Sequence, residues 1–259
     1  MAIKLLADPH GRFENLEETV SSEDILLVLG DLLDLIDWAD ISGILPEVVG
    51  RENLIKKLMS AAREGSRAAV SLRDELLAPD GGFYEELLRR VGESYEDFVG
   101  ALERIGCAAY VIFGNGDIPE PLEAALDGSP NVLLARGKFD IGGSTFGFVP
   151  GALYSPFMMP AEMDDGAFGE RLTELGPVDV LCTHIPPRLE AATMDVVAGR
   201  PVEGSESLLR YIEENKPRIV YHGHVHQPAQ RELIVGETRV INVAYYKRTG
   251  YIHTHGVSP

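Results

Sequence analysis

The segment Tyr221-His222-Gly223-His224-Val225-His226 holds three of the seven histidines of the chain. It follows residues 216–220, a Lys-Pro-Arg-Ile-Val run that predicts a helix end passing into a short buried strand. Gly223 allows the backbone to turn at the end of that strand, so His224 and His226 can converge on one point. Two interpretations follow from the segment alone. It is either a turn with structural histidines or a metal site, because neutral imidazole is the commonest metal ligand.

The composition places limits on the rest of the chain. The 259 residues are 45% hydrophobic and 25% charged, which is an ordinary globular composition. This length suits one large α/β domain or two small ones, and we expect one domain over residues 1–259. The formal net charge of −18 argues against a general nucleic-acid binder, because such proteins neutralise phosphates with Lys and Arg. Bound divalent cations would reverse the local field and still attract an anionic substrate.

Cysteine content and hydropathy indicate the compartment. Cys107 and Cys182 lie in apolar runs and are predicted to be buried free thiols. The first eight residues are too short and too soon charged for a signal peptide. No apolar run reaches the roughly 20 residues that span a bilayer. We therefore expect a cytoplasmic protein without a membrane partner.

Short apolar runs alternate with helical segments, which predicts parallel strands buried on both faces. In α/β sheets, functional sites lie beyond the carboxyl ends of the strands. Five of the predicted strands end in residues that can bind a metal ion. These residues are Asp8 with His10, Asp31, Asn115, His184, and His224 with His226.

The helical spacing of apolar residues predicts five helical segments in the first part of the chain. Residues 12–20 should form one short amphipathic helix. Residues 35–106 should form a helical insertion between the second and third core strands, with helices over 52–63, 66–77, 83–91 and 95–105. A packing role is expected for this insertion, with a lid or an interaction surface as the alternative, and any oligomer should form through it.

The motifs together resemble those of the calcineurin-like metallophosphoesterase superfamily, and most of all its single-domain prokaryotic Icc-like phosphoesterases. The matching motifs are Asp8-x-His10, Gly30-Asp31-x-x-Asp34, Gly114-Asn115-x-Asp117, His184-x-Pro186-Pro187 and Gly223-His224-x-His226. The resemblance implies a four-layer α/β/β/α sandwich around two divalent metal ions, with Mn, Fe, Zn or Ni suited to the mixed ligands.

The same resemblance implies a role for each motif residue. One metal would take Asp8, His10 and His226, the other would take Asn115, His184 and His224, and Asp31 would bridge them. Asp31 and Asn115 would help to position a metal-bridging hydroxide and the phosphate, with the ions about 3.5–4 Å apart. Asp34 would lie behind the ligands and orient a ligand histidine.

One position departs from the family pattern. Many members have a histidine after the motif asparagine, where it protonates the leaving group or stabilises the phosphoryl group, and here that residue is Gly116. A general acid typically contributes 10²–10⁴-fold. Other members carry Cys at this position and remain phosphodiesterases. Without the histidine, Asp117 is expected to cap the helix that begins near Pro119.

Four residues outside the motifs have competing interpretations. Arg188 could bind a substrate phosphate through its guanidinium or be a solvated surface residue. Tyr154 could line the cleft or donate a proton, although a surface role is favoured. His222 is interpreted as structural, because strand alternation directs it away from His224. Trp38 is interpreted as a packing anchor.

The leading hypothesis is a dinuclear metal-dependent phosphoesterase that acts on a small substrate, with phosphodiesters favoured by the loss of the histidine at Gly116. The first alternative is a metal-bearing interaction scaffold with weak or no catalysis, because a fold does not guarantee activity. The second is a nuclease, against which the acidic charge counts.

Overall fold

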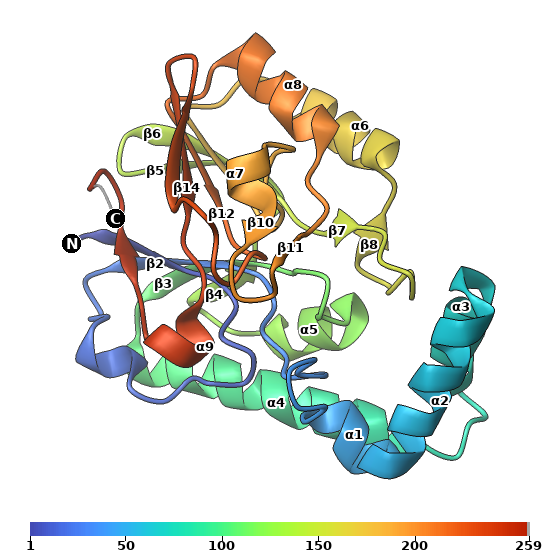
Figure 1. Cartoon of the computed structure of the whole chain (residues 1–259). Coiled ribbons are helices and arrows are strands. Elements are labelled where there is room, and N and C mark those ends of the chain that lie inside the picture. The colour runs from blue at the N-terminus through green and yellow to red at the C-terminus, as the bar shows by residue number, and fades with distance from the viewer. Residues whose placement is uncertain (258–259) are drawn as a thin grey trace.

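Residues 1–257 are described by a computed structural model, in which two β-sheets face each other and helices cover both outer faces (Figure 1). One sheet has the strand order β15-β1-β2-β3-β4, and the other has the order β13-β14-β12-β9-β6-β5. None of the described helices is long and apolar enough to cross a membrane.

The first sheet is built on the parallel strands β1 (Ile3–Leu6), β2 (Ile25–Leu29), β3 (Ala108–Ile112) and β4 (Val132–Leu134). Strand β2 is almost entirely buried, as expected for an apolar run covered on both faces. The short strand β15 (His253–Thr254) closes one edge and runs antiparallel to β1.

The second sheet has a parallel centre and antiparallel edges. Its parallel strands are β6 (Ser144–Val149), β9 (Val180–Thr183), β12 (Ile219–His222) and β14 (Thr238–Asn242). The edges are β5 (Gly137–Ile141) and β13 (Glu232–Val235). The β5–β6 hairpin turns at Gly142 and Gly143, both of which have positive φ.

Three apolar layers hold the sandwich together. Leu27, Phe146 and Tyr221 belong to the buried cluster between the two sheets. Helices α4 (Tyr84–Ile105) and α5 (Pro119–Leu126) cover the first sheet, and α6 (Asp165–Leu175) and α8 (Glu206–Asn215) cover the second (Figure 1). The predicted four-layer α/β/β/α architecture is therefore confirmed. Cys107 and Cys182 are buried and free, also as predicted.

Four helices lie between β2 and β3. Helices α2 (Arg51–Glu64) and α3 (Ser66–Leu76) pack on each other and, with α1 (Ile44–Val49), form a small apolar cluster of their own. Helix α4 instead packs against the first sheet. It runs unbroken where two helices were expected, because the apolar positions on both sides of Gly92 fall on one buried face. The bounds 35–106 of the insertion remain a prediction.

The short helix expected at residues 12–20 is only a 3₁₀ turn, η1 (Leu16–Glu18). Asn15 has a left-handed backbone with φ of 66°, which prevents a longer helix from starting upstream. The remaining short elements are β7 (Ala152–Leu153), β8 (Glu162–Met163), α7 (Glu190–Thr193), β10 (Met194–Asp195), β11 (Arg200–Pro201) and α9 (Tyr246–Thr249).

Candidate metal centre

The site lies beyond the carboxyl ends of the parallel strands, where hydrogen bonds between main-chain groups join the loops. The amide of Asp8 donates to the carbonyl of Gly30 at 3.1 Å, and the amide of His10 donates to the carbonyl of Asp31 at 3.0 Å. Asp8, His10, Asp31 and His224 all have φ between 42° and 68°. Non-glycine residues rarely adopt this conformation, and it persists mainly at functional sites where the surrounding structure enforces it.

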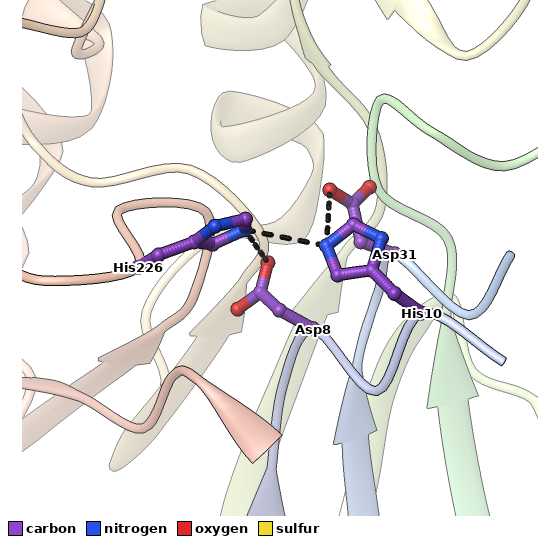
Figure 2. Close-up of side chains that lie close together, drawn as sticks. All are labelled: Asp8, His10, Asp31 and His226. Carbon is purple, nitrogen blue, oxygen red and sulfur yellow. Dashed lines mark hydrogen bonds and ion pairs between the residues drawn. The ribbon is translucent and has the colours of Figure 1, made fainter. Parts of the chain in front are cut away.

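The first group of side chains contains Asp8, His10, Asp31 and His226, whose candidate ligand atoms all lie within 4.8 Å of one another (Figure 2). The Nε2 atoms of His10 and His226 are 3.2 Å apart. An oxygen of Asp8 lies 3.8 Å from Nε2 of His226, and an oxygen of Asp31 lies 3.8 Å from Nε2 of His10. These polar atoms converge on one point.

The second group contains Asp31, His184 and His224, again with ligand atoms within 4.8 Å. Oδ1 of Asp31 lies 3.4 Å from Nε2 of His184, and Oδ1 of Asn115 lies 3.1 Å from the same nitrogen. Asp31 is therefore common to both groups. The structure brings together all seven residues that the motifs single out as candidate ligands.

Two main-chain carbonyls fix the orientation of two imidazoles. Nδ1 of His10 lies 3.0 Å from the carbonyl of Leu33, and Nδ1 of His184 lies 2.8 Å from the carbonyl of Leu29. Because a carbonyl can only accept, Nδ1 carries the proton in each ring. Each Nε2 then has a lone pair for a metal ion that Asp31 could also bind, and a carbonyl at Nδ1 is the usual arrangement behind metal-bound histidines.

The charges of this region favour a bound cation. Asp8 and Asp31 are both buried, and burial together with the neighbouring Asp31 charge holds the pKa of Asp8 well above its usual value. Burial lowers the pKa of His224 to about 3 and that of His226 to about 4, so both imidazoles are neutral at pH 7. Buried carboxylates beside neutral imidazoles lack a compensating positive charge, and divalent ions would supply it.

Two glycines make the close approach possible. A Cβ on Gly223 would lie 2.5 Å from Cβ of Ala7 and 2.7 Å from Oδ2 of Asp8. A Cβ on Gly114 would overlap Oδ1 of Asp31. Any larger residue at these positions would force the strand ends apart.

The expected role of Asp34 was wrong. Its carboxylate oxygens each accept a hydrogen bond from Nζ of Lys247 at 2.9 Å, and Nδ1 of the nearby His10 lies against the carbonyl of Leu33 instead. The ammonium group holds the carboxylate because a charge-assisted hydrogen bond is stronger than one between neutral groups.

Asp117 does not cap the following helix either. Its Oδ1 accepts hydrogen bonds from the amides of Leu32 at 2.9 Å and Leu33 at 3.2 Å, and its Oδ2 accepts one from the amide of Gly114 at 2.8 Å. The hydroxyl of Tyr95 also donates to it, at 3.2 Å. The buried carboxylate thus ties the loop after β2 to the loop after β3, and these loops carry Asp31 and Asn115.

The remaining predicted residues lie as follows. Arg188 is exposed and forms an ion pair with Glu206 at 2.6 Å. Tyr154 is 42% exposed and follows β7. His222 is buried, with Nδ1 3.1 Å from the carbonyl of Gly223, which agrees with a structural role.

Tyr245 and Lys247 were missed by the sequence analysis. The Tyr245 ring stacks on His226 with centroids 3.9 Å apart, and the amide of Lys247 donates to the carbonyl of Asp8 at 3.1 Å. Both residues lie just beyond the end of β14 and outside the motifs, so no pattern in the sequence pointed to them.

Comparison with known proteins gives a family for the chain. The model of the family described as calcineurin-like phosphoesterase matches residues 74–228. The chain belongs to this family. The matched stretch includes Asn115, His184, His224 and His226, whereas Asp8, His10 and Asp31 precede it. Membership of the calcineurin-like phosphoesterases carries metal-dependent hydrolysis of phosphate esters as the general activity.

Solved structures show the same fold at low sequence identity. One crystal structure has 17% identity and a TM-score of 0.63, with 99% of this chain and 98% of the other covered. The protein TT1561 of Thermus thermophilus has 13% identity and a TM-score of 0.54, with 97% and 96% covered. No curated protein matches the chain.

Proposed function

We propose that this calcineurin-like phosphoesterase uses two divalent metal ions to hydrolyse small phosphodiesters. The observation that carries the proposal is the position of Asp31. Its Oδ2 lies 3.8 Å from Nε2 of His10 and its Oδ1 lies 3.4 Å from Nε2 of His184, so one carboxylate faces both groups of imidazoles. A carboxylate can bridge two cations in this position, and Mn, Fe, Zn or Ni would suit the mixed nitrogen and oxygen donors.

The chain's own residues prepare the site for such ions. The amide of His224 donates to both oxygens of Asp8 at 3.1 Å, which orients that carboxylate. Asn115 offers its carbonyl oxygen toward the His184 side, and its amide NH₂ can donate to a phosphoryl oxygen. Bound ions would generate the nucleophile from water and offset the charge of the phosphoryl group.

The preference for diesters rests on Gly116. This residue cannot protonate a leaving group, and its amide instead donates to Oδ1 of Asp31 at 2.8 Å. Substrates whose leaving groups depart without a proton are therefore favoured. A small anionic substrate also fits the net charge of −18 once cations are bound, whereas a long nucleic acid does not.

The test combines metal analysis with an assay. The purified protein, loaded separately with Mn²⁺, Fe²⁺, Co²⁺, Ni²⁺ or Zn²⁺, is expected to hold about two ions per chain and to hydrolyse bis(p-nitrophenyl) phosphate. Asp31→Asn should lose activity and lower the affinity for both ions. A wild-type protein that stays inert with every metal overturns the proposal.

The structure offers no specific support for the scaffold alternative. Among the described residues of α1 to α4, Met59 is the one large hydrophobic side chain that is exposed. Oligomerisation through these helices therefore remains a proposal to be tested by light scattering. A cytoplasmic location likewise remains a proposal, to which the two buried free thiols lend support.

A further inference from the structure

A second set of side chains lies beside the metal centre and is centred on Asp37. Its Oδ1 accepts a hydrogen bond from the amide of Ala39 at 3.0 Å, and its own amide donates to the carbonyl of Ser42 at 2.8 Å. Its Oδ2 pairs with Nζ of Lys247 at 3.0 Å. The loop after β2 is therefore held in one conformation at this point.

Lys247 connects this loop to the candidate ligands. While its ammonium group binds Asp37, its amide donates to the carbonyl of Asp8 at 3.1 Å. Two residues earlier, Tyr245 stacks on His226. The Asp37 loop is thus joined to the candidate ligands through the contacts of Lys247 and Tyr245. The Asp37 loop and α9 together are called the rim.

Trp38 presents an aromatic surface on this rim. The indole stacks on Phe157, with centroids 5.7 Å apart and an interplanar angle of 24°. Although Phe157 covers one face, Trp38 is still 56% exposed. A large aromatic side chain held by a partner and left half open to water is suited to stacking against a planar ligand. The expected packing role of Trp38 explains the contact with Phe157 and leaves the open surface unexplained.

Arg248 places a positive charge on the same rim. Its side chain is 61% exposed, and Oδ2 of Asp37 lies 4.0 Å from its guanidinium. That oxygen is closer to Lys247, at 3.0 Å. Its guanidinium also hydrogen-bonds to the hydroxyl of Tyr245, and among the described residues its one ion pair is the long one with Asp37, so part of its charge is available to an anion. A cation held near a candidate phosphoesterase site is notable in a chain with a net charge of −18.

We propose that Trp38 and Arg248 form a substrate subsite that recognises a nucleotide-type diester with a second phosphate. Trp38 stacks on the base, Arg248 binds the phosphate that does not react, and the metal centre takes the diester to be hydrolysed. The inference rests on the proposed function and adds to it the class of the substrate. In the reaction, the oxygen of water bonds to phosphorus and loses a proton to solvent, while the bond from phosphorus to one ester oxygen breaks. The leaving group departs as phenolate, or takes a proton from water and departs as an alcohol.

Three substrates that release the same leaving group test each part of the subsite. Ethyl p-nitrophenyl phosphate has neither a base nor a second phosphate, and thymidine 5′-(p-nitrophenyl phosphate) adds the base. Thymidine 3′-phosphate 5′-(p-nitrophenyl phosphate) adds both. We expect kcat/KM of the wild-type enzyme, loaded with its most active metal, to rise about tenfold at each step, as base stacking and a charge-assisted contact each supply.

The variants should remove one step each. Trp38→Ala should abolish the gain from the base and Trp38→Phe should retain most of it. Arg248→Ala should abolish the gain from the second phosphate and Arg248→Lys should retain part of it. None of the four should change the rate with the ethyl ester. The matched controls Met59→Ala and Arg136→Ala, which alter similarly exposed side chains elsewhere, should preserve both gains.

The outcomes separate this inference from the proposed function. A wild-type enzyme that does not cleave the ethyl ester with any metal contradicts the phosphodiesterase itself. Cleavage of all three esters at the same rate contradicts the subsite alone. Equal losses on all three substrates in Trp38→Ala or Arg248→Ala also overturn the inference, because they would indicate a general effect on the metal centre.

Discussion

The ring of Tyr245 lies almost parallel to the ring of His226, with centroids 3.9 Å apart and an angle of 8° between the planes. The same phenol ring meets His10 edge to face, with centroids 5.8 Å apart. One aromatic side chain thus supports two of the imidazoles that converge with Asp8 and Asp31. Replacing a residue that orients a metal ligand typically lowers metal affinity about 10- to 100-fold.

Replacing Tyr245 should therefore weaken one ion more than the other. In Tyr245→Ala, His226 loses its stacking partner, and we expect affinity for the ion on the Asp8 side to fall about tenfold. Stepwise metal titration followed by calorimetry measures the two affinities. Tyr245→Phe keeps the ring and should bind both ions normally. Equal losses in the Ala and Phe variants would show that the hydroxyl, and not the stack, matters.

His224 and His226, which follow β12, should bind different ions. His224→Ala is expected to lose the ion on the His184 side, and His226→Ala the ion on the His10 side, because each lies in a different group of ligand atoms. Mn²⁺ stoichiometry and electron paramagnetic resonance distinguish a coupled pair from a single ion. His222→Gln is the control, since His222 belongs to neither group and its Nδ1 lies against the carbonyl of Gly223. Simultaneous loss of both ions in each variant would contradict the assignment.

A histidine introduced at Gly116 should act as a general acid. A Cβ at this position lies 3.3 Å from Oδ1 of Asp31, so a small shift is enough to admit a side chain. In Gly116→His we expect hydrolysis of alkyl esters, which have poor leaving groups, to rise at least about tenfold. p-Nitrophenyl esters should gain little. Gly116→Ala controls for crowding, and equal rates in the two variants would refute the idea.

Removing the carboxylate of Asp117 should destabilise the protein. Asp117→Ala leaves three buried main-chain amides without the acceptor they have now. We expect the free energy of unfolding to fall by about 3 kcal/mol or more, as measured by urea denaturation. Asp140→Ala, at an exposed position, should change it by less than about 0.5 kcal/mol. An unchanged midpoint in Asp117→Ala would mean that water replaces the carboxylate.

His253 should make stability depend on pH. Its Nε2 is buried without a hydrogen-bond partner, and burial with nearby Arg239 lowers its pKa to about 4 from 6.5. The unfolded chain therefore takes up this proton first, and stability falls as the pH drops from 6.5 toward 4. By pH 5 the loss from this residue is about 2 kcal/mol.

The comparison of wild type with His253→Gln at pH 7 and pH 5 isolates this contribution. His253 lies in β15, paired with β1 and outside both groups of candidate ligands, so the metal-loaded protein can be used. The variant should lose less stability on acidification than the wild type does. Parallel pH profiles would show that His253 is already neutral in the unfolded chain or charged in the fold.

Much of the architecture was predictable because its signals are local. Continuous apolar runs indicated the buried strands, and the residues at the ends of those strands indicated the candidate ligands. The helix predicted over residues 12–20 does not form because Asn15 has a left-handed backbone, which the spacing of apolar residues does not reveal. Two helices were predicted where α4 forms one. Packing against the first sheet outweighs the cost of Gly92 in the helix, and the sequence does not show that packing.

The sequence by itself determined which residues could form a metal centre, because it shows both the type of each possible ligand and its position at the end of a predicted strand. Only the tertiary structure decided how those residues are supported. Lys247 pairs with Asp34, Asp117 joins two loops, and Tyr245 stacks on His226. These contacts join residues far apart in the chain through charge, buried hydrogen bonds and ring packing. Their partners are therefore fixed by the way the strands and loops meet, which no local pattern records.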